Sequence, residues 1–279
     1  MRSITVSVLQ LRARTSKEES SKAVLSLASM ARGDIIVLPE YAMVDPTGIA
    51  PQDLYSASEP IEGGWVSTLR RIAREKGSCI VGTLFERTDK PPLVYNTVVL
   101  IDERGDIAGV YRKTHLFDAL GYRESEKMLP GEELFSPVDL CGARVGVAVC
   151  FELRYPEVFR LQALRGAEVF IVPSAWYRGP AKEETYKFLA QARAHENVSY
   201  LVGAVLAGER FTGRSIVVDP YGLVRAQAGF GEELLEYKLD PELLERARRD
   251  LPLLSLRRDD LYVLGEKRVG GYSSTGTIS

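Results

Sequence analysis

The stretch Val145-Gly-Val-Ala-Val-Cys-Phe-Glu-Leu-Arg-Tyr-Pro-Glu157 begins as a continuous apolar run and ends abruptly in a charged segment. The run predicts a buried strand over 145–149, because short apolar segments bounded by turn residues are typical of strands covered on both faces. Cys150 stands where that strand ends. In α/β proteins, catalytic side chains gather just beyond the carboxyl ends of strands. Cys150 is therefore a candidate nucleophile, although a cysteine in an apolar strand is also compatible with a small core residue.

Two other strand-like runs end in a charged side chain. Ile35-Ile-Val-Leu-Pro-Glu40 delivers a carboxylate, and Val110-Tyr-Arg-Lys113 delivers an ammonium group. A thiol nucleophile needs a base or a positive charge beside it, because the pKa of a free thiol is about 8.5. Glu40 could take the thiol proton and later give it to a leaving amine, while Lys113 could stabilise an oxyanion. A solvated glutamate and a surface lysine remain the alternatives.

Strand-like and helix-like segments alternate along the chain, and this alternation predicts an α/β fold with helices on the outer faces of sheets. Strands are expected at 4–10, 35–39, 79–85, 94–101, 107–111, 145–149, 169–173, 200–205, 214–218 and 223–228, and helices at 16–31, 65–76, 156–165, 183–197 and from 240. Turn sequences at 102–106 and 219–222 predict hairpins, so the sheets should not be purely parallel. We expect one domain over 1–263, followed by a tail at 264–279 that is flexible or held at a subunit interface.

The overall composition excludes several classes of function. With 279 residues, of which 45% are hydrophobic, the chain can bury a large core. A net charge of −2 with both signs interspersed gives no reason to expect nucleic acid or an anionic membrane as a partner. No apolar run approaches the roughly 20 residues that span a bilayer, and the first residues lack the apolar stretch of a signal peptide. The expected location is the cytoplasm.

The other cysteines and the two histidines give no sign of a metal or disulfide site. Cys79 and Cys141 are expected to be small buried apolar residues, and three cysteines in a reduced cytoplasmic chain do not make a disulfide framework. A Cys–His hydrolase would need His115 or His195 beside the nucleophile. Two histidines without paired cysteine spacing make a zinc site unexpected, and no glycine-rich nucleotide motif is present. We therefore expect neither a metal nor a cofactor.

At the three strand ends, the sequence resembles the carbon–nitrogen hydrolase (nitrilase) superfamily. The glutamate, lysine and cysteine motifs of that superfamily look like Leu38-Pro-Glu-Tyr41, Tyr111-Arg-Lys-Thr-His-Leu-Phe117 and Gly146-Val-Ala-Val-Cys-Phe-Glu-Leu-Arg-Tyr-Pro-Glu157, in family order. Further similarity is found in the segments 122–125, 130–131, 172–175, 192–197, 219–222, 251–254 and 257–262. The resemblance covers roughly residues 3–263, and it rests on the order of the three motifs rather than on any one of them.

The resemblance implies both a fold and a site. The fold would be an α-β-β-α sandwich that pairs with a second subunit into a four-layer dimer core. The site would be a catalytic triad of Glu40, Lys113 and Cys150, with Glu124 as a second glutamate that positions the substrate and the lysine. The amide of Phe151 would complete the oxyanion hole, and no cofactor or metal would be required. From composition alone, Glu124 is equally compatible with a solvated loop.

The residues after the cysteine bear on the branch of the superfamily. Phe-Glu-Leu-Arg-Tyr-Pro resembles the Cys-Tyr-Asp-Leu-Arg-Phe-Pro-Glu motif of amidases, which include ω-amidase, more than the Trp-Glu of true nitrilases. The chain departs from that motif at Phe151 and at Glu152, whose extra methylene could shift a contact behind the site. Arg154 could bind a substrate carboxylate or form a structural ion pair. Trp176 could line an apolar pocket or simply be packed.

The expected reaction is hydrolysis of a small-molecule amide to a carboxylate and ammonia through a cysteine thioester. Two alternatives stay open. The same triad could serve a nitrilase, whose substrate is a nitrile, or an N-carbamoyl hydrolase. The fold could also serve a catalytically silent oligomeric scaffold. The expected partners are a small-molecule amide or nitrile and further copies of the chain in a homodimer or a larger homo-oligomer.

Overall fold

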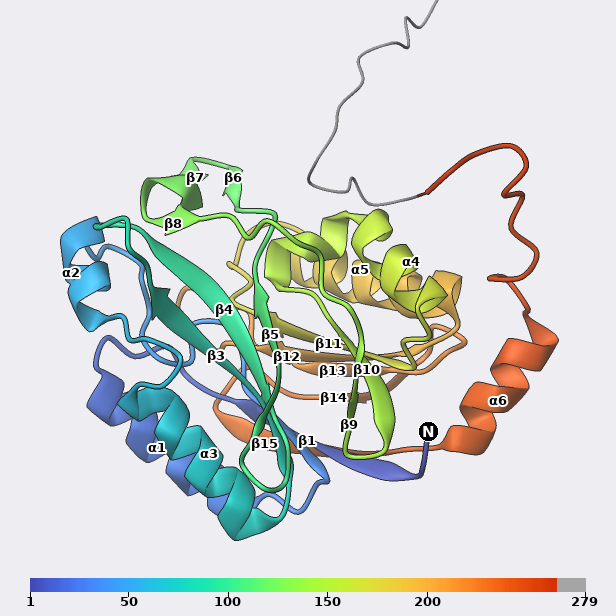
Figure 1. The fold of residues 1–279 in the computed structure, drawn as a ribbon, viewed down its shortest axis with the longest axis horizontal. Helices are drawn as coiled ribbons and strands as arrows, with labels where there is room; N and C mark the ends of the chain where they lie inside the picture. The colour runs from blue at the N-terminus through green and yellow to red at the C-terminus, as the bar shows by residue number, and fades with distance from the viewer. Residues whose placement is uncertain (265–279) are drawn as a thin grey trace, which may run out of the picture.

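The computed structural model describes residues 1–264, so all but Leu264 of the tail expected at 264–279 lies outside the described residues. Two β-sheets lie face to face, and helices cover the outer face of each (Figure 1). This arrangement is the expected α-β-β-α sandwich. It follows from the sequence pattern, because strands covered on both faces read as nearly continuous apolar runs.

The first sheet is built mainly from the N-terminal half of the chain and has the strand order β15-β1-β2-β3-β4-β5, with β8 paired to β4. Its strands are β1 (Ile4–Gln10), β2 (Ile35–Val37), β3 (Cys79–Arg87), β4 (Val94–Ile101), β5 (Ile107–Arg112), β8 (Met128–Leu129) and β15 (Glu233–Leu239). β1, β2 and β3 are parallel, whereas β4 and β5 form the antiparallel hairpin that the turn around Gly105 predicts. Glu40 and Lys113 follow two strands of this sheet.

The second sheet has the order β14-β13-β12-β11-β10-β9 and carries Cys150. Its strands are β9 (Val138–Leu140), β10 (Ala143–Val147), β11 (Val169–Ser174), β12 (Tyr200–Val205), β13 (Ile216–Val218) and β14 (Val224–Gln227). β10, β11 and β12 are parallel, and their carboxyl ends therefore meet at one edge. A small separate hairpin is formed by β6 (Asp118–Ala119) and β7 (Tyr122–Arg123).

The helices lie on opposite sides of the two sheets. α1 (Lys17–Met30) and α3 (Gly64–Lys76) cover the first sheet, whereas α4 (Pro156–Leu164) and α5 (Lys182–Asn197) cover the second (Figure 1). α1 begins where the Ser16 side chain accepts the backbone N–H of Glu19, and α3 ends at Gly77 with φ of 62°. The remaining elements are α2 (Pro51–Ala57), α6 (Pro241–Asp250) and the short 3-10 turns η1 (Glu124–Glu126) and η2 (Cys150–Arg154).

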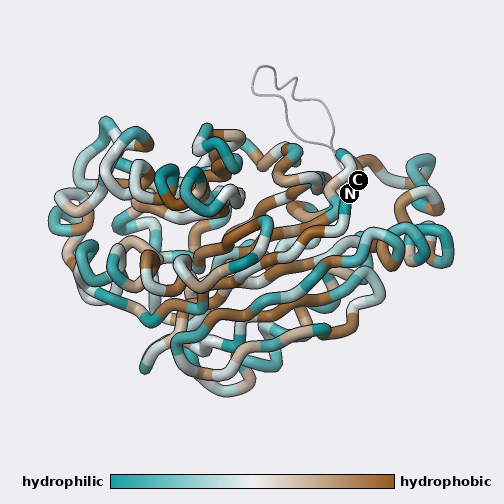
Figure 2. The backbone as a smooth tube through the Cα atoms, turned by 90° about the horizontal axis from the view of Figure 1, so that it is seen from below, coloured by the Kyte–Doolittle hydropathy of each residue, from teal (hydrophilic) through white to brown (hydrophobic). Residues whose placement is uncertain are grey.

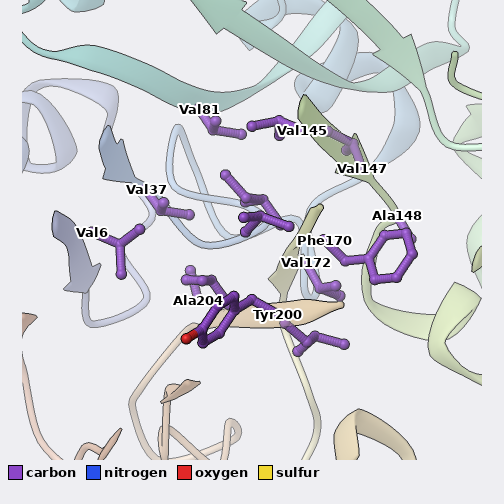
Figure 3. Packing of buried hydrophobic residues seen from close by; sticks show 14 of the residues in the cluster. Val6, Val37, Val81, Val145, Val147, Ala148, Phe170, Val172, Tyr200 and Ala204 are labelled. Atoms are coloured by element: carbon purple, nitrogen blue, oxygen red, sulfur yellow. The ribbon is translucent and has the colours of Figure 1, made fainter. Parts of the chain in front are cut away.

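The main core lies between the two sheets. Val6, Val37 and Val81 from the first sheet face Val145 and Val147 from the second (Figure 3). Alternate residues of the first sheet point the other way and pack with α1 and α3 in a second cluster. The central strands are accordingly the most apolar part of the backbone, while helices and loops carry most of the hydrophilic residues (Figure 2).

The expectation for Cys79 and Cys141 was wrong. Cys79 is the first residue of β3 in one sheet, and Cys141 lies in the turn between β9 and β10 in the other. The two form a disulfide with a Cα–Cα distance of 6.1 Å. They lie 62 residues apart in the chain, and only the packing of the two sheets brings them together. Local sequence therefore carries no signal for the bond.

Candidate active site

A pocket lies where the first and second sheets bring their strand ends together. Glu40 follows β2, Lys113 follows β5, and Cys150 begins η2 just after β10. All three side chains line the pocket and are almost fully buried. The other lining residues are Tyr41, Phe117, Phe151, Arg154, Ala175, Trp176, Tyr177 and Lys182.

Lys113 is held between two carboxylates. Its Nζ lies 2.9 Å from Glu40 Oε1 and 2.8 Å from Glu124 Oε2. Burial alone would lower the pKa of Lys113, but the charges of Glu124 and Glu40 outweigh that effect and raise the pKa well above its usual value. The ammonium group is therefore a fixed, permanent positive charge at the wall of the pocket.

Glu40 is oriented by donors on both of its oxygens. Besides Lys113, Asn96 Nδ2 donates to Oε1 at 2.8 Å, and the backbone N–H of Ala175 donates to Oε2 at 2.7 Å. Burial raises the pKa of Glu40, Lys113 opposes that rise, and the neighbouring Glu124 adds to it. A carboxyl with a raised pKa is suited to take up and release a proton near the operating pH.

Glu124 is buried rather than part of a solvated loop. Its side chain has no exposed surface, and η1 turns it inward toward Lys113. The Tyr41 hydroxyl donates to its Oε1 at 3.0 Å, and the Phe117 N–H donates to its Oε2 at 2.6 Å. Glu124 thus forms a second ion pair with Lys113, beside that of Glu40.

Cys150 stands on a tight turn with φ of 47°, a left-handed conformation that costs a non-glycine residue of order 1–3 kcal/mol. Such a turn pushes the side chain of a residue out of the strand and into the pocket. Burial raises the pKa of the Cys150 thiol well above its usual value, and the charge of Glu40 adds to that rise while Lys113 opposes it. Burial and the Glu40 charge both favour the protonated form of the thiol.

Arg154 and Lys182 give the mouth of the pocket a positive charge. The Arg154 guanidinium lies 4.2 Å from the centre of the Trp176 ring and 5.2 Å from that of Phe151. The Trp176 indole N–H donates to the backbone oxygen of Lys182 at 2.8 Å, which ties the start of α5 to the pocket. Burial lowers the pKa of both Arg154 and Lys182. Within residues 1–264, neither cation forms an ion pair with a carboxylate.

Two residues that donate to the site carboxylates, Asn96 and Tyr41, were not predicted as site residues. Asn96 could have been found, because a polar side chain inside the apolar run of β4 needs a buried partner. Tyr41 carries no comparable signal. The structure places both histidines outside the pocket lining: His115 Nδ1 lies 3.4 Å from Glu152, and His195 Nδ1 lies 3.2 Å from the Tyr221 carbonyl oxygen. A Cys–His pair at Cys150 is therefore not formed.

In the described part of the chain, one cluster of side chains has the residue types that bind metal ions, and it lies away from the pocket. It comprises Cys79, Cys141 and Glu103. The disulfide joins the two sulfur atoms of this group. Among residues 1–264, no helix has the length and apolar character needed to cross a membrane.

The sequence profile of the Carbon-nitrogen hydrolase family matches residues 5–249. The chain belongs to this family. The Deaminated glutathione amidase of Escherichia coli O157:H7 is 33% identical over 234 residues, which cover 83% of this chain and 88% of that protein. Omega-amidase NIT3 of Saccharomyces cerevisiae is 36% identical over 193 residues, 65% of each chain. This carbon–nitrogen hydrolase also resembles the crystal structure of Saccharomyces cerevisiae Nit3, a member of branch 10 of the nitrilase superfamily. The TM-score is 0.82 at 30% identity, covering 92% of this chain and 97% of that one.

Proposed function

We propose that this carbon–nitrogen hydrolase converts a small-molecule amide to a carboxylate and ammonia through a thioester on Cys150. The observation that carries the proposal is the buried Lys113 ammonium, held by Glu40 and Glu124 in the pocket that contains the thiol. A base, a nucleophile and a fixed cation together meet the needs of acyl transfer. The amidase names of the relatives support an amide as the substrate.

In the first half of the reaction, Glu40 takes the thiol proton while the sulfur of Cys150 bonds to the amide carbon. The carbonyl electrons move to oxygen, and Lys113 with the Phe151 N–H stabilises this oxyanion. The carbon–nitrogen bond then breaks, and Glu40 returns its proton to the nitrogen, which leaves as ammonia. The product of this half is a thioester on Cys150.

In the second half, a water molecule gives a proton to Glu40 and its oxygen attacks the thioester carbon. The carbon–sulfur bond breaks, and the proton on Glu40 returns to the sulfur. Glu124 takes no proton in this scheme, and its role is to hold Lys113 and the substrate in place. The raised pKa of Glu40 supports its double use, because a more basic carboxylate takes the thiol proton more readily and keeps it until the nitrogen leaves.

We further propose that the substrate amide carries a carboxylate at its other end. Arg154 supports this, because its guanidinium faces the pocket with no carboxylate partner within residues 1–264. Lys182 adds a second positive charge at the same side. Trp176 supplies the flat apolar wall on which Arg154 rests. Planar guanidinium groups bind carboxylates through two parallel hydrogen bonds.

The test is ammonia release from simple aliphatic amides, from ω-amides of dicarboxylic acids, from nitriles and from N-carbamoyl amino acids. We expect the ω-amides to have the highest kcat/KM and Arg154→Ala to remove that preference while the rate with aliphatic amides changes little. Faster release from a nitrile or a carbamoyl compound would replace the amidase proposal with one of those activities. Absence of turnover on every class would favour the scaffold.

We also propose that the protein works in the cytoplasm as a homodimer or a larger homo-oligomer. Exposed apolar side chains on α4 and α5, Leu164 at 41% and Phe188 at 57%, support pairing through that outer layer. Disulfides are rare in the cytosol of mesophiles but occur inside hyperthermophiles, and a chain with only two asparagines has a composition of that kind. Sedimentation of the wild type and of Phe188→Glu tests the pairing, and a monomeric wild type would contradict it.

A further inference from the structure

A third buried glutamate lies behind the pocket, on the same turn as the nucleophile. Glu152 is part of η2 and has no exposed surface. It does not line the pocket, and the mechanism above gives it no role. Within residues 1–264, its nearest basic group is the His115 ring, whose Nδ1 lies 3.4 Å from Oε1. A buried carboxylate without a close cation needs many hydrogen-bond donors.

Those donors come from two different segments. On one side, Glu152 Oε2 accepts the Val149 N–H at 2.8 Å, immediately before Cys150. On the other side, Oε1 accepts the Thr114 N–H at 2.9 Å and the Tyr111 hydroxyl at 2.7 Å. The Thr114 hydroxyl and the His115 N–H also donate to Oε1, at 2.7 and 3.1 Å. One carboxylate thus joins the turn of the nucleophile to the segment on both sides of Lys113.

All five of these partners are N–H or O–H donors, so the charged form of Glu152 is the one that fits. Burial alone would raise the pKa of Glu152, but the hydrogen bonds from His115, Thr114, Tyr111 and Val149 outweigh burial and lower it. A neutral amide in the same place would turn its NH₂ group toward other donors. Glutamine should therefore be unable to hold the two segments together.

We propose that Glu152 is a positioning residue for the reaction, which sets the distance between the Cys150 sulfur and the Lys113 ammonium. This inference rests on the proposed function, because it assumes that the two groups act on one substrate. Cys150 belongs to the second sheet and Lys113 to the first, so their separation depends on contacts between the sheets. Glu152 makes such a contact, because it accepts the N–H of Val149, next to Cys150, and the N–H of Thr114, next to Lys113.

The first test compares Glu152→Gln with Glu157→Gln, an exposed glutamate in the first turn of α4. We expect Glu152→Gln to lower kcat about 100-fold and to change KM less than about threefold, since a misplacement of about 1 Å can cost that much in rate. Glu157→Gln should keep both constants. A glutamate with a purely structural role would lower the Tm and leave kcat at 25 °C unchanged.

The second test removes single donors and leaves the carboxylate in place. Thr114→Val and Tyr111→Phe each delete a hydroxyl that donates to Oε1. We expect each to lower kcat about 3- to 10-fold, which corresponds to the loss of one hydrogen bond. In the Glu152→Gln background, the same changes should have almost no further effect, because coupled residues are not additive. If Glu152→Gln does not fold, the kcat values of Thr114→Val and Tyr111→Phe still test the role of Glu152.

The third test does not depend on turnover. Under non-reducing conditions Cys150 is the free cysteine of the described chain, and its carbamoylmethylation by iodoacetamide can be followed by mass. We expect Glu152→Gln to slow labelling at least tenfold relative to the wild type and to Glu157→Gln. Wild-type kcat and labelling rates in folded Glu152→Gln, or in both single-donor variants, overturn the inference. A wild type that hydrolyses no amide overturns the proposed function instead, and the labelling rates then decide the role of Glu152.

Discussion

Cysteine lies beside glutamate at two places in this protein. The sulfur is a free thiol at the first place and part of a disulfide at the second. At the first, the Cys150 thiol faces Glu40 and Lys113 inside the pocket and remains free. At the second, Cys79 and Cys141 form a disulfide, and the Glu103 carboxylate lies 3.5 Å from the sulfur of Cys79. A carboxylate is a useful neighbour of a thiol only where a cation is also present, because it can then accept the proton without leaving two negative charges together.

At the second site, no cation of residues 1–264 forms an ion pair with the Glu103 carboxylate. The Arg2 guanidinium contacts the Cys141 carbonyl oxygen and Asp34 rather than Glu103. A thiolate released from the disulfide would therefore form beside a negative charge, which disfavours it. The same pair of residue types, cysteine and glutamate, thus occurs around the proposed nucleophile in one place and around a disulfide in the other. The two sites differ in the Lys113 ammonium group, which pairs with Glu40 beside Cys150.

Removing the reactive sulfur is expected to have the largest effect. Cys150→Ala should lower amidase kcat by roughly 10⁴-fold or more, because no other group in the pocket can form the thioester. Its Tm should stay close to that of the wild type. Steady-state ammonia release and thermal melting measure the two quantities. Turnover at wild-type rates in Cys150→Ala would falsify the assignment of the nucleophile.

Replacing Lys113 should leave the carboxylates at the Cys150 site without a cation, as is the case for Glu103 at the Cys79–Cys141 site. Lys113→Met is expected to abolish turnover and also to destabilise the fold by about 3–5 kcal/mol, since Glu40 and Glu124 are left buried without a positive charge. Adding Glu124→Gln should restore part of the stability but none of the activity. Denaturant unfolding of the three proteins checks this. Equal stability of wild type and Lys113→Met would contradict the charge balance proposed for the site.

Opening the disulfide should change stability without changing chemistry. The bond closes a loop of 62 residues between the sheets, and such a link contributes about 2–4 kcal/mol. Cys79→Ala with Cys141→Ala is therefore expected to lower the Tm by roughly 5–15 °C and to keep kcat within about twofold at 25 °C. A free-thiol titration before and after reduction verifies the starting state. A large loss of kcat at 25 °C would mean that the two sulfur sites are not independent.

The smallest predicted effect is a shift in the pKa of Glu40, the proposed base. The raised pKa of Glu40 places the acid limb of the kcat/KM profile above pH 4.5, and activity is lost as the pH falls and Glu40 becomes protonated. Asn96→Ala removes a donor to the charged carboxylate, so the pKa should rise further and the limb should move upward by less than about one pH unit. A downward shift would show that Asn96 stabilises the protonated form.

The parts that local sequence predicts are the strand ends and the residues at them. Glu40, Lys113 and Cys150 each follow an apolar run, and the carboxyl ends of parallel strands meet at one edge of their own sheet. Contacts across the interface between the sheets could not be predicted. The Cys79–Cys141 bond and the donors around Glu152 depend on how the second sheet lies on the first, and no local pattern encodes that position.

β15 shows a different limit. Its residues, Glu-Leu-Leu-Glu-Tyr-Lys-Leu over 233–239, mix charged and apolar side chains, and we did not predict a strand there. The pattern is weak because β15 lies at the edge of the first sheet, where every residue of the strand except Leu239 is partly or fully exposed. Expected and observed boundaries also differ at Cys150, since β10 ends at Val147 rather than at 149.

The position of β15 also has a consequence for the synthesis of the chain. β1 is made first, yet its antiparallel partner begins at Glu233, with Ile4 opposite Leu239. At about 5–20 residues per second, a ribosome needs on the order of 10–50 s to reach that partner. During this interval one edge of β1 has no native strand to bind, and pairings this distant along the chain form slowly. A nascent chain of this protein is thus exposed to strand-mediated aggregation until β15 has been translated.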